Sequence, residues 1–454
     1  MSADLSAIAE RAPQNPTQTV RQPVLLIRDI FSALDCIGIR WSLLREYDDY
    51  ADLIRSDIDC LLGPETSRAR LVQAIRDECR RHDAHIVRCD GLYIVVCGFE
   101  NDAPFFLHFD FCTQCHVGNV FLYGAEEVLA SSRLNGSFRV PSSDVEFGAY
   151  LMKCIIKRSL TWEKARRLSR LYAASPEACA RQIHRFWNAP AAEEIALLAS
   201  AGDWVGIRKR LEEFRAGLVL RAALRSPAWA IKHTLNVIGR RVSHLRRPNG
   251  LHVALLGCDG AGKSTVISAT LDAFGAGFPN SAVYGFVPAL MQQALHGSNR
   301  RTDTPHALEP RSAAVSIARA LMYWFPYYSI GYVFRYVELA RSTFILNDRH
   351  FVDVLVDKRR YRYGGPEWLL RAIWRLIPKP DVILLLDAPP DVLFARKTET
   401  SFAEVSRQCL AYRELAKSIP LIKIVNAERP LPAVLLQINR LLVAFLEERA
   451  LSRM

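Results

Sequence analysis

The stretch Leu251–Val266, LHVALLGCDGAGKSTV, constrains the fold of this 454-residue chain more than any other segment. It begins with an apolar run typical of a buried strand, and the glycine-rich turn Gly257–Gly262 follows directly. Glycines allow consecutive backbone N–H groups to point into one hollow that accepts phosphate oxygens, and the helix predicted from Lys263 adds its positive N-terminal end. The pattern G-x-x-x-x-G-K-[ST] between a strand and a helix therefore predicts a phosphate-binding loop.

The side chains of this loop indicate a nucleoside triphosphate that binds together with a divalent metal ion. Lys263 can reach the β- and γ-phosphates, and the hydroxyl of Ser264 can hold Mg²⁺. We therefore expect ATP and Mg²⁺ as cofactors. The residues predicted to bind the nucleotide are Gly257, Asp259, Gly260, Ala261, Gly262, Lys263, Ser264 and Thr265.

Apolar strands alternate with helical patterns through the C-terminal half of the chain. We predict strands near residues 282–286, 342–346, 381–387 and 421–425. This alternation indicates an α/β fold with a parallel sheet and helices on both faces. Ligands bind such sheets at the carboxyl ends of the strands. Gly257, Asp348 and Asp387 fall at these ends, so we expect them to meet at one edge of the sheet.

Residues 250–450 resemble thymidylate kinase. The resemblance lies in the glycine loop, in the pair Asp348–Arg349 after a strand, and in the segment Pro380–Asp391. It implies transfer of the γ-phosphate of ATP to the phosphate of a deoxynucleoside monophosphate. In that reaction Lys263 would stabilise the transferring group, and Asp348 would assist at the acceptor or metal. Arg349 would hold the acceptor phosphate, and Arg396 would cap the developing charge.

The departures from this family concern the acceptor. The R-E-P-G-G segment of the family is absent, and residues 309–311 are a poor counterpart. His350 follows the Asp348–Arg349 pair, and Asp353 and Arg360 either continue the acceptor site or lie on a surface helix. The acceptor is therefore left open as dTMP or a related phosphate or sugar.

Carboxylates are spaced for a second site in the N-terminal part. Asp57 and Asp59 are two residues apart on a predicted strand, so both point from one face, and Asp110 lies on another apolar strand. Three clustered carboxylates repel one another, and divalent metal ions remove this cost. We therefore predict a metal site at Asp57, Asp59 and Asp110; the alternative is that these are unrelated surface charges.

Residues 20–160 resemble the nucleotidyltransferase fold of the DNA polymerase β type, in which a D-x-D strand and a later aspartate hold two Mg²⁺ ions. The glycine-serine turn that usually precedes the D-x-D strand is not evident, and Ser42–Tyr47 stands in its place. The resemblance therefore implies the fold and leaves nucleotidyl transfer open.

The expected organisation has five parts. They are a flexible arm (1–20), a smaller nucleotidyltransferase-like α/β domain (21–140), a helical extension (141–238), a basic linker (239–250) and the P-loop domain (251–454). The linker is assigned because it is rich in arginine and ends in turn residues.

Composition narrows the function classes. The net charge of +12 suits a protein that handles anions such as nucleotides, and a solvated basic surface explains it equally well, so we expect no specific nucleic-acid partner. Eleven scattered cysteines and a polar start predict reduced thiols and a cytoplasmic protein. We predict no membrane-spanning segment, because no stretch reaches about 18 uncharged apolar residues.

The leading expectation is a nucleoside monophosphate kinase of the thymidylate kinase type. The sequence is also compatible with a homodimer. One alternative is a bifunctional enzyme in which both halves act in sequence to make an activated sugar or nucleotide. The other is an ATP-binding regulatory module with little turnover.

Overall fold

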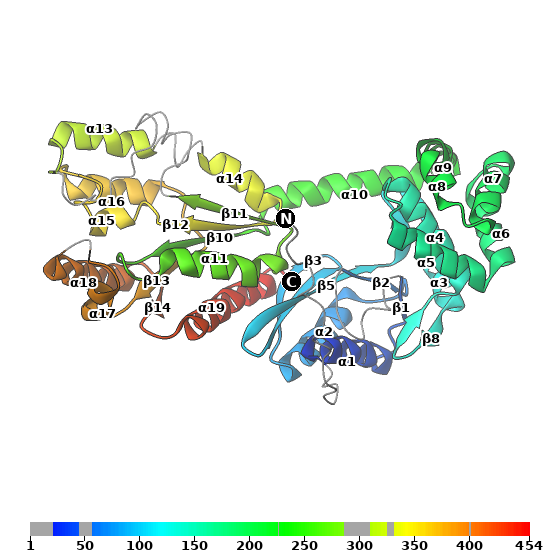
Figure 1. Cartoon of the computed structure of the whole chain (residues 1–454), viewed down its shortest axis with the longest axis horizontal. Helices are drawn as coiled ribbons and strands as arrows, with labels where there is room; N and C mark the ends of the chain where they lie inside the picture. Colours follow the sequence, from blue (N-terminus) through cyan, green and yellow to red (C-terminus); the bar gives the residue numbers. More distant parts are fainter. Residues whose placement is uncertain (1–20, 45–56, 226, 286–308, 325–330, 399–400) are drawn as a thin grey trace, which may run out of the picture.

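The computed structural model describes residues 21–44, 57–225, 227–285, 309–324, 331–398 and 401–454. Two five-stranded sheets and a helical segment make up this part of the chain (Figure 1). The predicted arm of residues 1–20 lies outside the described residues, as do residues 45–47, half of the segment expected in place of the glycine-serine turn.

The N-terminal sheet is mixed, with strand order β1-β2-β5-β4-β3. Its central pair β2 and β5 is parallel, and the other neighbours are antiparallel. Helices α1 and α2 bury their apolar faces on one side of it, where Ile58, Cys60 and Leu62 of β2 point. The bounds are α1 Gln22–Cys36, β1 Trp41–Leu43, β2 Ile58–Leu62, α2 Arg68–Arg81, β3 His85–Asp90, β4 Tyr93–Glu100 and β5 Ala103–Cys112.

Two hairpins and a group of helices follow. The hairpins, which the sequence analysis did not predict, pair β6 with β7 and β8 with β9. The helices pack around a separate apolar core that includes Phe147 and Trp187. The bounds are β6 Gln114–Val117, β7 Val120–Gly124, α3 Ala125–Ser131, β8 Arg133–Asn135, β9 Phe138–Val140, α4 Ser143–Ile156, α5 Trp162–Ala174, α6 Pro176–Phe186, α7 Ala189–Ser200, α8 Trp204–Lys209 and α9 Leu211–Arg225.

The long helix α10 (Pro227–Arg246) runs along the upper edge of the molecule in Figure 1, between the helical group and the second sheet. Residues 239–246, which we expected to belong to a basic linker, therefore continue this helix. Arginine is a good helix former, so an arginine-rich segment is compatible with helix until Pro248 stops it.

The second sheet is parallel throughout, in the order β11-β12-β10-β13-β14. Its central strand β10 is buried at every residue. The prediction of a parallel sheet from apolar runs is thereby confirmed, because a strand covered on both faces needs apolar side chains on both. The strand bounds are β10 Leu251–Leu256, β11 Asn280–Gly285, β12 Thr343–Asp348, β13 Val382–Asp387 and β14 Ile422–Asn426.

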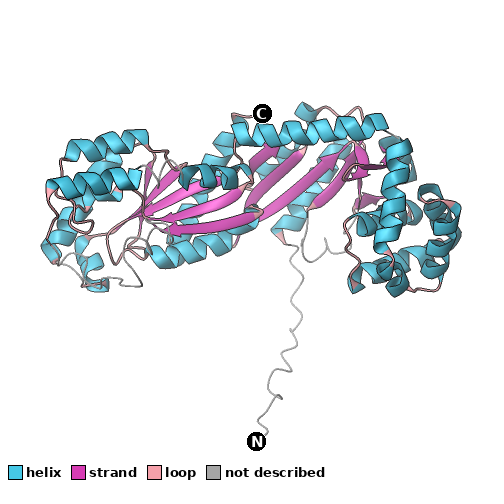
Figure 2. Cartoon of the chain, turned by 90° about the horizontal axis from the view of Figure 1, so that it is seen from above, coloured by secondary structure: helices cyan, strands magenta, loops and turns pink. Residues whose placement is uncertain are grey.

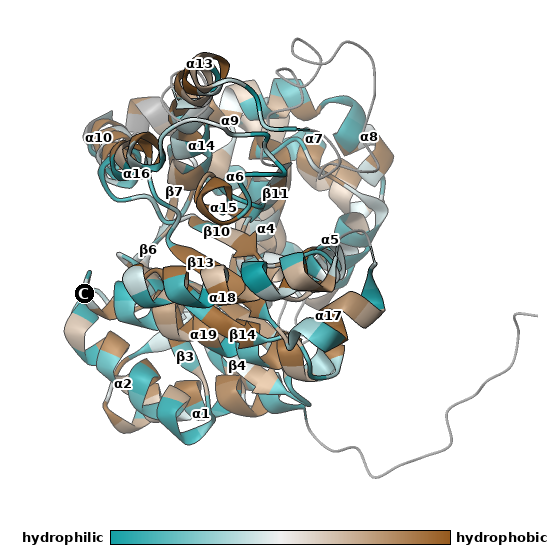
Figure 3. Ribbon diagram, turned by 90° about the vertical axis from the view of Figure 1, so that its left-hand side faces the viewer, coloured by the Kyte–Doolittle hydropathy of each residue, from teal (hydrophilic) through white to brown (hydrophobic). Residues whose placement is uncertain are grey.

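Helices cover both faces of this sheet, as Figure 2 shows. Hydrophobic residues dominate the central strands in Figure 3, whereas outer helices such as α2 and α18 mix polar and apolar residues. The bounds are α11 Lys263–Phe274, η2 Gly275–Gly277, α13 Ala313–Tyr323, α14 Gly331–Ala340, α15 Asp353–Val356, α16 Glu367–Leu376, α17 Pro390–Arg396, α18 Phe402–Ser418 and α19 Leu431–Leu451.

The two sheets share one hydrophobic core. Val87, Val95 and Cys97 of the N-terminal sheet belong to the same buried cluster as the strands of the second sheet. Helix α19 crosses β3, and its Arg440 guanidinium lies 3.9 Å from the ring centroid of Phe99 and bonds Asp83. Burial of hydrophobic surface in this shared core therefore holds the two halves together, and the ion pair of Arg440 with Asp83 adds to it.

Candidate functional site

The glycine loop passes from the end of β10 into α11. Gly257 has a φ of 144°, and a Cβ added to it would lie 2.7 Å from the carbonyl oxygen of Leu386. A side chain at this position would therefore be both strained and blocked by β13. Gly262 caps α11 in the left-handed conformation with a φ of 82°. Ser264 and Thr265 lie exposed in the first turn of α11, so their hydroxyl groups are accessible to a ligand.

Lys263 folds back over the loop. Its Nζ donates to the carbonyl oxygens of Gly257 at 2.9 Å and of Cys258 at 2.8 Å, and lies 3.7 Å from Oδ1 of Asp259. Burial, assisted by the nearby charge of Arg349, lowers the pKa of Lys263 to about 8. An incoming phosphate would add negative charge beside this buried ammonium group and so favour its protonated form.

Asp259 links the loop to two arginines. Its Oδ1 accepts from Arg349 and its Oδ2 from Arg360, each at 2.7 Å. Burial alone would raise the pKa of Asp259, but Lys263, Arg349 and Arg360 outweigh it and hold that pKa at about 2. The carboxylate is therefore ionised at any physiological pH, and it fixes both guanidinium groups beside the glycine loop.

Asp353 is the buried centre of a second set of contacts. It is fully inaccessible and accepts from Nη1 of Arg349 and from the hydroxyl of Tyr361, both at 2.7 Å, and from the hydroxyl of Tyr412. Burial alone would raise the pKa of Asp353, but Arg349 and the two hydroxyl groups lower it. The alternative that Asp353 lies on a surface helix is wrong, because α15 is only four residues long and carries this side chain inward.

Arg349 is thus clamped between Asp259 and Asp353. It has a φ of 70°, which is uncommon for a residue with a Cβ, and its backbone N–H donates to Leu255 on β10. Backbone strain of this kind costs about 1–3 kcal/mol and persists where surrounding contacts fix it, often at functional sites.

Asp348 ends β12 directly beside Leu255 of β10. Among the described residues, its Oδ1 atom is buried and has no hydrogen-bond partner. Its charge is also close enough to Lys263 to raise the pKa of that group against the effect of burial. A carboxylate oxygen is the ligand type that Mg²⁺ prefers. The buried oxygen of Asp348 beside the glycine loop therefore fits this ion.

Arg396 does not join this cluster. It lies at the end of α17, and its Nη1 donates to the carbonyl oxygen of Ala427 at 2.9 Å. Asp387, at the end of β13, is paired with Arg413 at 3.0 Å. The structure therefore brings Lys263, Asp348 and Arg349 together at the sheet edge, whereas the guanidinium group of Arg396 bonds the carbonyl oxygen that follows β14.

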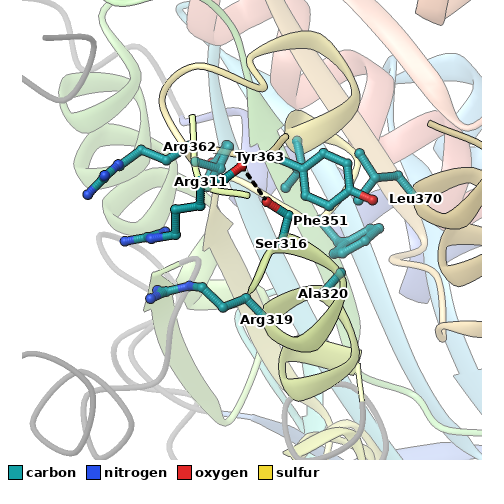
Figure 4. Close-up of a pocket in the computed structure, with 10 residues that line it drawn as sticks. Arg311, Ser316, Arg319, Ala320, Phe351, Arg362, Tyr363 and Leu370 are labelled. Carbon is teal, nitrogen blue, oxygen red and sulfur yellow. Dashed lines mark hydrogen bonds between the residues drawn. The ribbon is translucent and has the colours of Figure 1, made fainter. Parts of the chain in front are cut away.

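A narrow pocket adjoins the cluster (Figure 4). Arg311, Arg319 and Arg362 extend from it in one direction, while Phe351 and Tyr363 form its apolar wall. Tyr361 lines the same pocket and bonds Asp353, so the pocket adjoins the clamp around Arg349. Residues 309–311 match the R-E-P-G-G segment of thymidylate kinases poorly. Their Arg311 nevertheless contributes one of the cationic side chains of this pocket.

The N-terminal carboxylates are arranged partly as predicted. Asp59 of β2 and Asp110 of β5 are register partners, so they lie side by side on one face of the sheet. Asp57 immediately precedes β2. Within the described ranges no group of three or more His, Cys, Asp or Glu side chains is arranged to hold a metal ion. The metal site at these three residues therefore stays a prediction.

Asp59 and Asp110 line a cavity of about 280 Å³. Lys153 of α4, Lys157 directly after this helix and Arg240 of α10 line the same cavity. A cavity lined by both carboxylates and cationic groups suits an anion that binds together with a metal ion.

A parallel sheet between two layers of helices, with a glycine turn after its central strand, defines an α/β fold consistent with P-loop kinases. No family model matches the chain. It is 28% identical over 218 residues to a thymidylate kinase of Xanthomonas euvesicatoria pv. vesicatoria (strain 85-10), a match that covers 45% of this chain and 88% of that protein. This similarity supports a kinase-like region. No helix in the described part of the chain is long and apolar enough to cross a membrane.

Several partners in the cluster were not predicted from the sequence. These are Arg360, which bonds Asp259, and Tyr361 and Tyr412, which bond Asp353. The spacing of Arg349 and Asp353, four residues apart, was a usable signal for their ion pair. Tyr412 lies on α18, far along the chain, and nothing in its local sequence indicates the contact.

Proposed function

We propose that the chain is an ATP- and Mg²⁺-dependent phosphotransferase whose acceptor is a nucleoside monophosphate, dTMP or a related phosphate or sugar. The observation that supports this most is the convergence of Lys263, Asp348 and Arg349 on the glycine loop at the carboxyl edge of a parallel sheet. The name of the similar Xanthomonas protein supports dTMP as the first acceptor to test.

The loop supplies the ATP half of the reaction. Backbone N–H groups of Gly260–Thr265 and the N-terminus of α11 would receive the β- and γ-phosphates. Lys263 would exchange its carbonyl partners for phosphate oxygens. Ser264 and Asp348 would hold Mg²⁺, which neutralises charge on the phosphates while the γ-phosphoryl group moves.

The transfer itself needs positioning and charge neutralisation. An oxygen of the acceptor attacks the γ-phosphorus, the bond from this phosphorus to the β–γ bridging oxygen breaks, and ADP leaves with that electron pair. Arg349, fixed by Asp259 and Asp353, would hold the acceptor phosphate in line. Arg396 would cap the developing charge only after it releases Ala427.

The three arginines of the pocket in Figure 4 support an anionic acceptor. Guanidinium groups bind phosphate oxygens in pairs, and the apolar wall of Phe351 and Tyr363 suits the flat face of a base or sugar. A phosphate-bearing acceptor would complement the positive charge of these arginines better than a neutral sugar would.

The test is ATP turnover by the full chain against a panel of nucleoside monophosphates, sugar phosphates and sugars. Wild type and Lys263→Ala are compared, and ATP binding is measured in parallel. We expect ADP formation that requires both Mg²⁺ and one acceptor class, and that falls by at least about 100-fold in the variant. Tight ATP binding without acceptor-dependent turnover would contradict the proposal and favour a regulatory module.

A second candidate function is nucleotidyl transfer at the N-terminal cavity, which would make the enzyme bifunctional. The specific observation in its favour is the register pairing of Asp59 with Asp110 in a cavity that Lys153 and Lys157 also line. Strand β5 also connects the two sites, because its Phe106 packs on Phe274 of α11 and its Asp110 lines the cavity.

Pyrophosphate release distinguishes this candidate from the kinase. The assay uses each nucleoside triphosphate with the product of the kinase reaction as acceptor. Release that is lost in Asp59→Asn and kept in Lys263→Ala supports a second active site. If no nucleoside triphosphate yields pyrophosphate, the N-terminal cavity does not catalyse nucleotidyl transfer.

A further inference from the structure

Helix α10 carries a regular apolar stripe on its solvent side. The stripe consists of Ile231, Leu235, Ile238, Val242 and Leu245, at successive steps of four, three, four and three residues. These steps place all five side chains along one face of a helix. Each of them is between 42% and 63% exposed. Adjacent exposed aliphatic residues on a protein surface mark a site where a protein partner or a membrane binds.

The opposite face of α10 is the one that packs on the protein, and it is polar and aromatic. Trp229 donates from Nε1 to Gln114 at 2.9 Å and stacks on His233, with ring centroids 4.9 Å apart. Arg240 lines the N-terminal cavity, and His244 bonds Asp90. The usual amphipathic arrangement is therefore inverted, since the polar and aromatic face contacts the protein and the aliphatic face is turned to solvent.

The charged residues of α10 and of its flanking sequence have a single sign. From Phe214 to Cys258 the sequence contains eight lysines and arginines and no aspartate or glutamate. At about 100° per residue, Lys232 and Arg246 flank the stripe on one side and Arg241 flanks it on the other. Long cationic side chains in these positions can reach anionic groups while the aliphatic residues enter an apolar layer.

We propose that α10 docks this protein on the surface of an anionic lipid bilayer. The helix would lie in the plane of the interface, with the stripe among the acyl chains and Lys232, Arg241 and Arg246 at the lipid phosphates. Burial of aliphatic side chains and attraction to anionic lipid act together on such a helix, and neither requires a span.

The same observations disfavour a second copy of the chain as the occupant. Two α10 helices paired through their stripes would bring Lys232, Arg241 and Arg246 of both copies together with no acidic residue on either helix. Stable coiled-coil pairs place opposite charges beside the apolar seam. Helix α14 extends the exposed apolar surface, because it packs against α10 and leaves Val333 and Phe334 61% and 71% exposed.

The test is flotation of the full chain with vesicles of phosphatidylcholine, with and without phosphatidylglycerol. The main variant is the double substitution Leu235→Glu with Ile238→Glu, and Leu197→Glu on α7 is the matched control, since Leu197 is also exposed. Arg241→Glu tests the charge alone, with Lys417→Glu on α18 as its control. Thermal unfolding and ATP turnover verify that each variant is folded.

We expect wild type to float with the anionic vesicles and to be released by salt. The double variant and Arg241→Glu should each weaken this binding by about tenfold or more, and both controls should leave it unchanged. Failure of wild type to bind, or equal binding by the double variant, would overturn the proposal. A concentration-dependent dimer that the double variant abolishes, without vesicle binding, would assign the stripe to self-association instead. If the double variant does not fold, Arg241→Glu alone decides.

Discussion

The affinity for ATP should fall steeply above pH 8, because Lys263 loses its proton in the free protein. Burial and Arg349 lower the pKa of Lys263 from 10.5 to about 8. Phosphates bound at the loop favour the charged form and restore the pKa toward its usual range. At a pH above 8, ATP binding must therefore be accompanied by protonation of Lys263. The free energy of this protonation reduces the affinity for ATP. The affinity for ATP is therefore expected to be highest below pH 8 and to decrease as the pH rises above 8.

The size of the effect follows from the shift. If the bound state keeps a pKa near 10.5, the affinity decreases about tenfold from pH 7 to pH 9, or roughly 1.4 kcal/mol. Calorimetric titration with MgATP at each pH measures it, and buffers of different ionisation enthalpy report the proton uptake directly.

Lys263→Arg is the matched control. Its guanidinium group stays protonated throughout this range, so any decrease that it shares with wild type belongs to another group. A wild-type affinity that changes less than about twofold between pH 7 and pH 9 would refute the reasoning, as would an equal decrease in Lys263→Arg.

Three further outcomes are expected. Gly257→Ala should abolish ATP binding in calorimetry, because its Cβ would lie 2.7 Å from the carbonyl oxygen of Leu386. Tyr412→Phe removes one hydrogen bond to the buried carboxylate of Asp353 and should lower the free energy of unfolding by about 2 kcal/mol in urea, whereas retained stability would show that the bond contributes little. Phe106→Ala, which removes a ring packed edge-on against Phe274, should cost about 2–3 kcal/mol and separate the thermal unfolding of the two sheets.

The local sequence was sufficient for the parts of the fold that depend on near neighbours. The glycine turn and the apolar strand before it are adjacent in the chain, and β10, β12 and β13 are apolar because both faces are covered. From these strands alone, Asp348 could be placed at the same edge as the glycine loop, and the register of β10 with β12 confirms that position.

Long-range contacts explain what could not be predicted. The helical spacing after Arg349 left Asp353 open between an acceptor site and a surface, and its burial depends on Tyr412, 59 residues away. The inverted face of α10 could not be recognised either, because its five aliphatic residues would usually be assigned to a core. Only the contacts of Trp229 and His244 reveal which face packs on the rest of the protein.

The central claim is tested most directly by product analysis with dTMP, Mg²⁺ and ATP labelled on its γ-phosphate. The account predicts that wild type moves the label onto dTMP and releases an equal amount of ADP, and that Lys263→Ala does neither. Label that remains in ATP, or that appears only as free phosphate with every acceptor tested, would contradict phosphoryl transfer at this site.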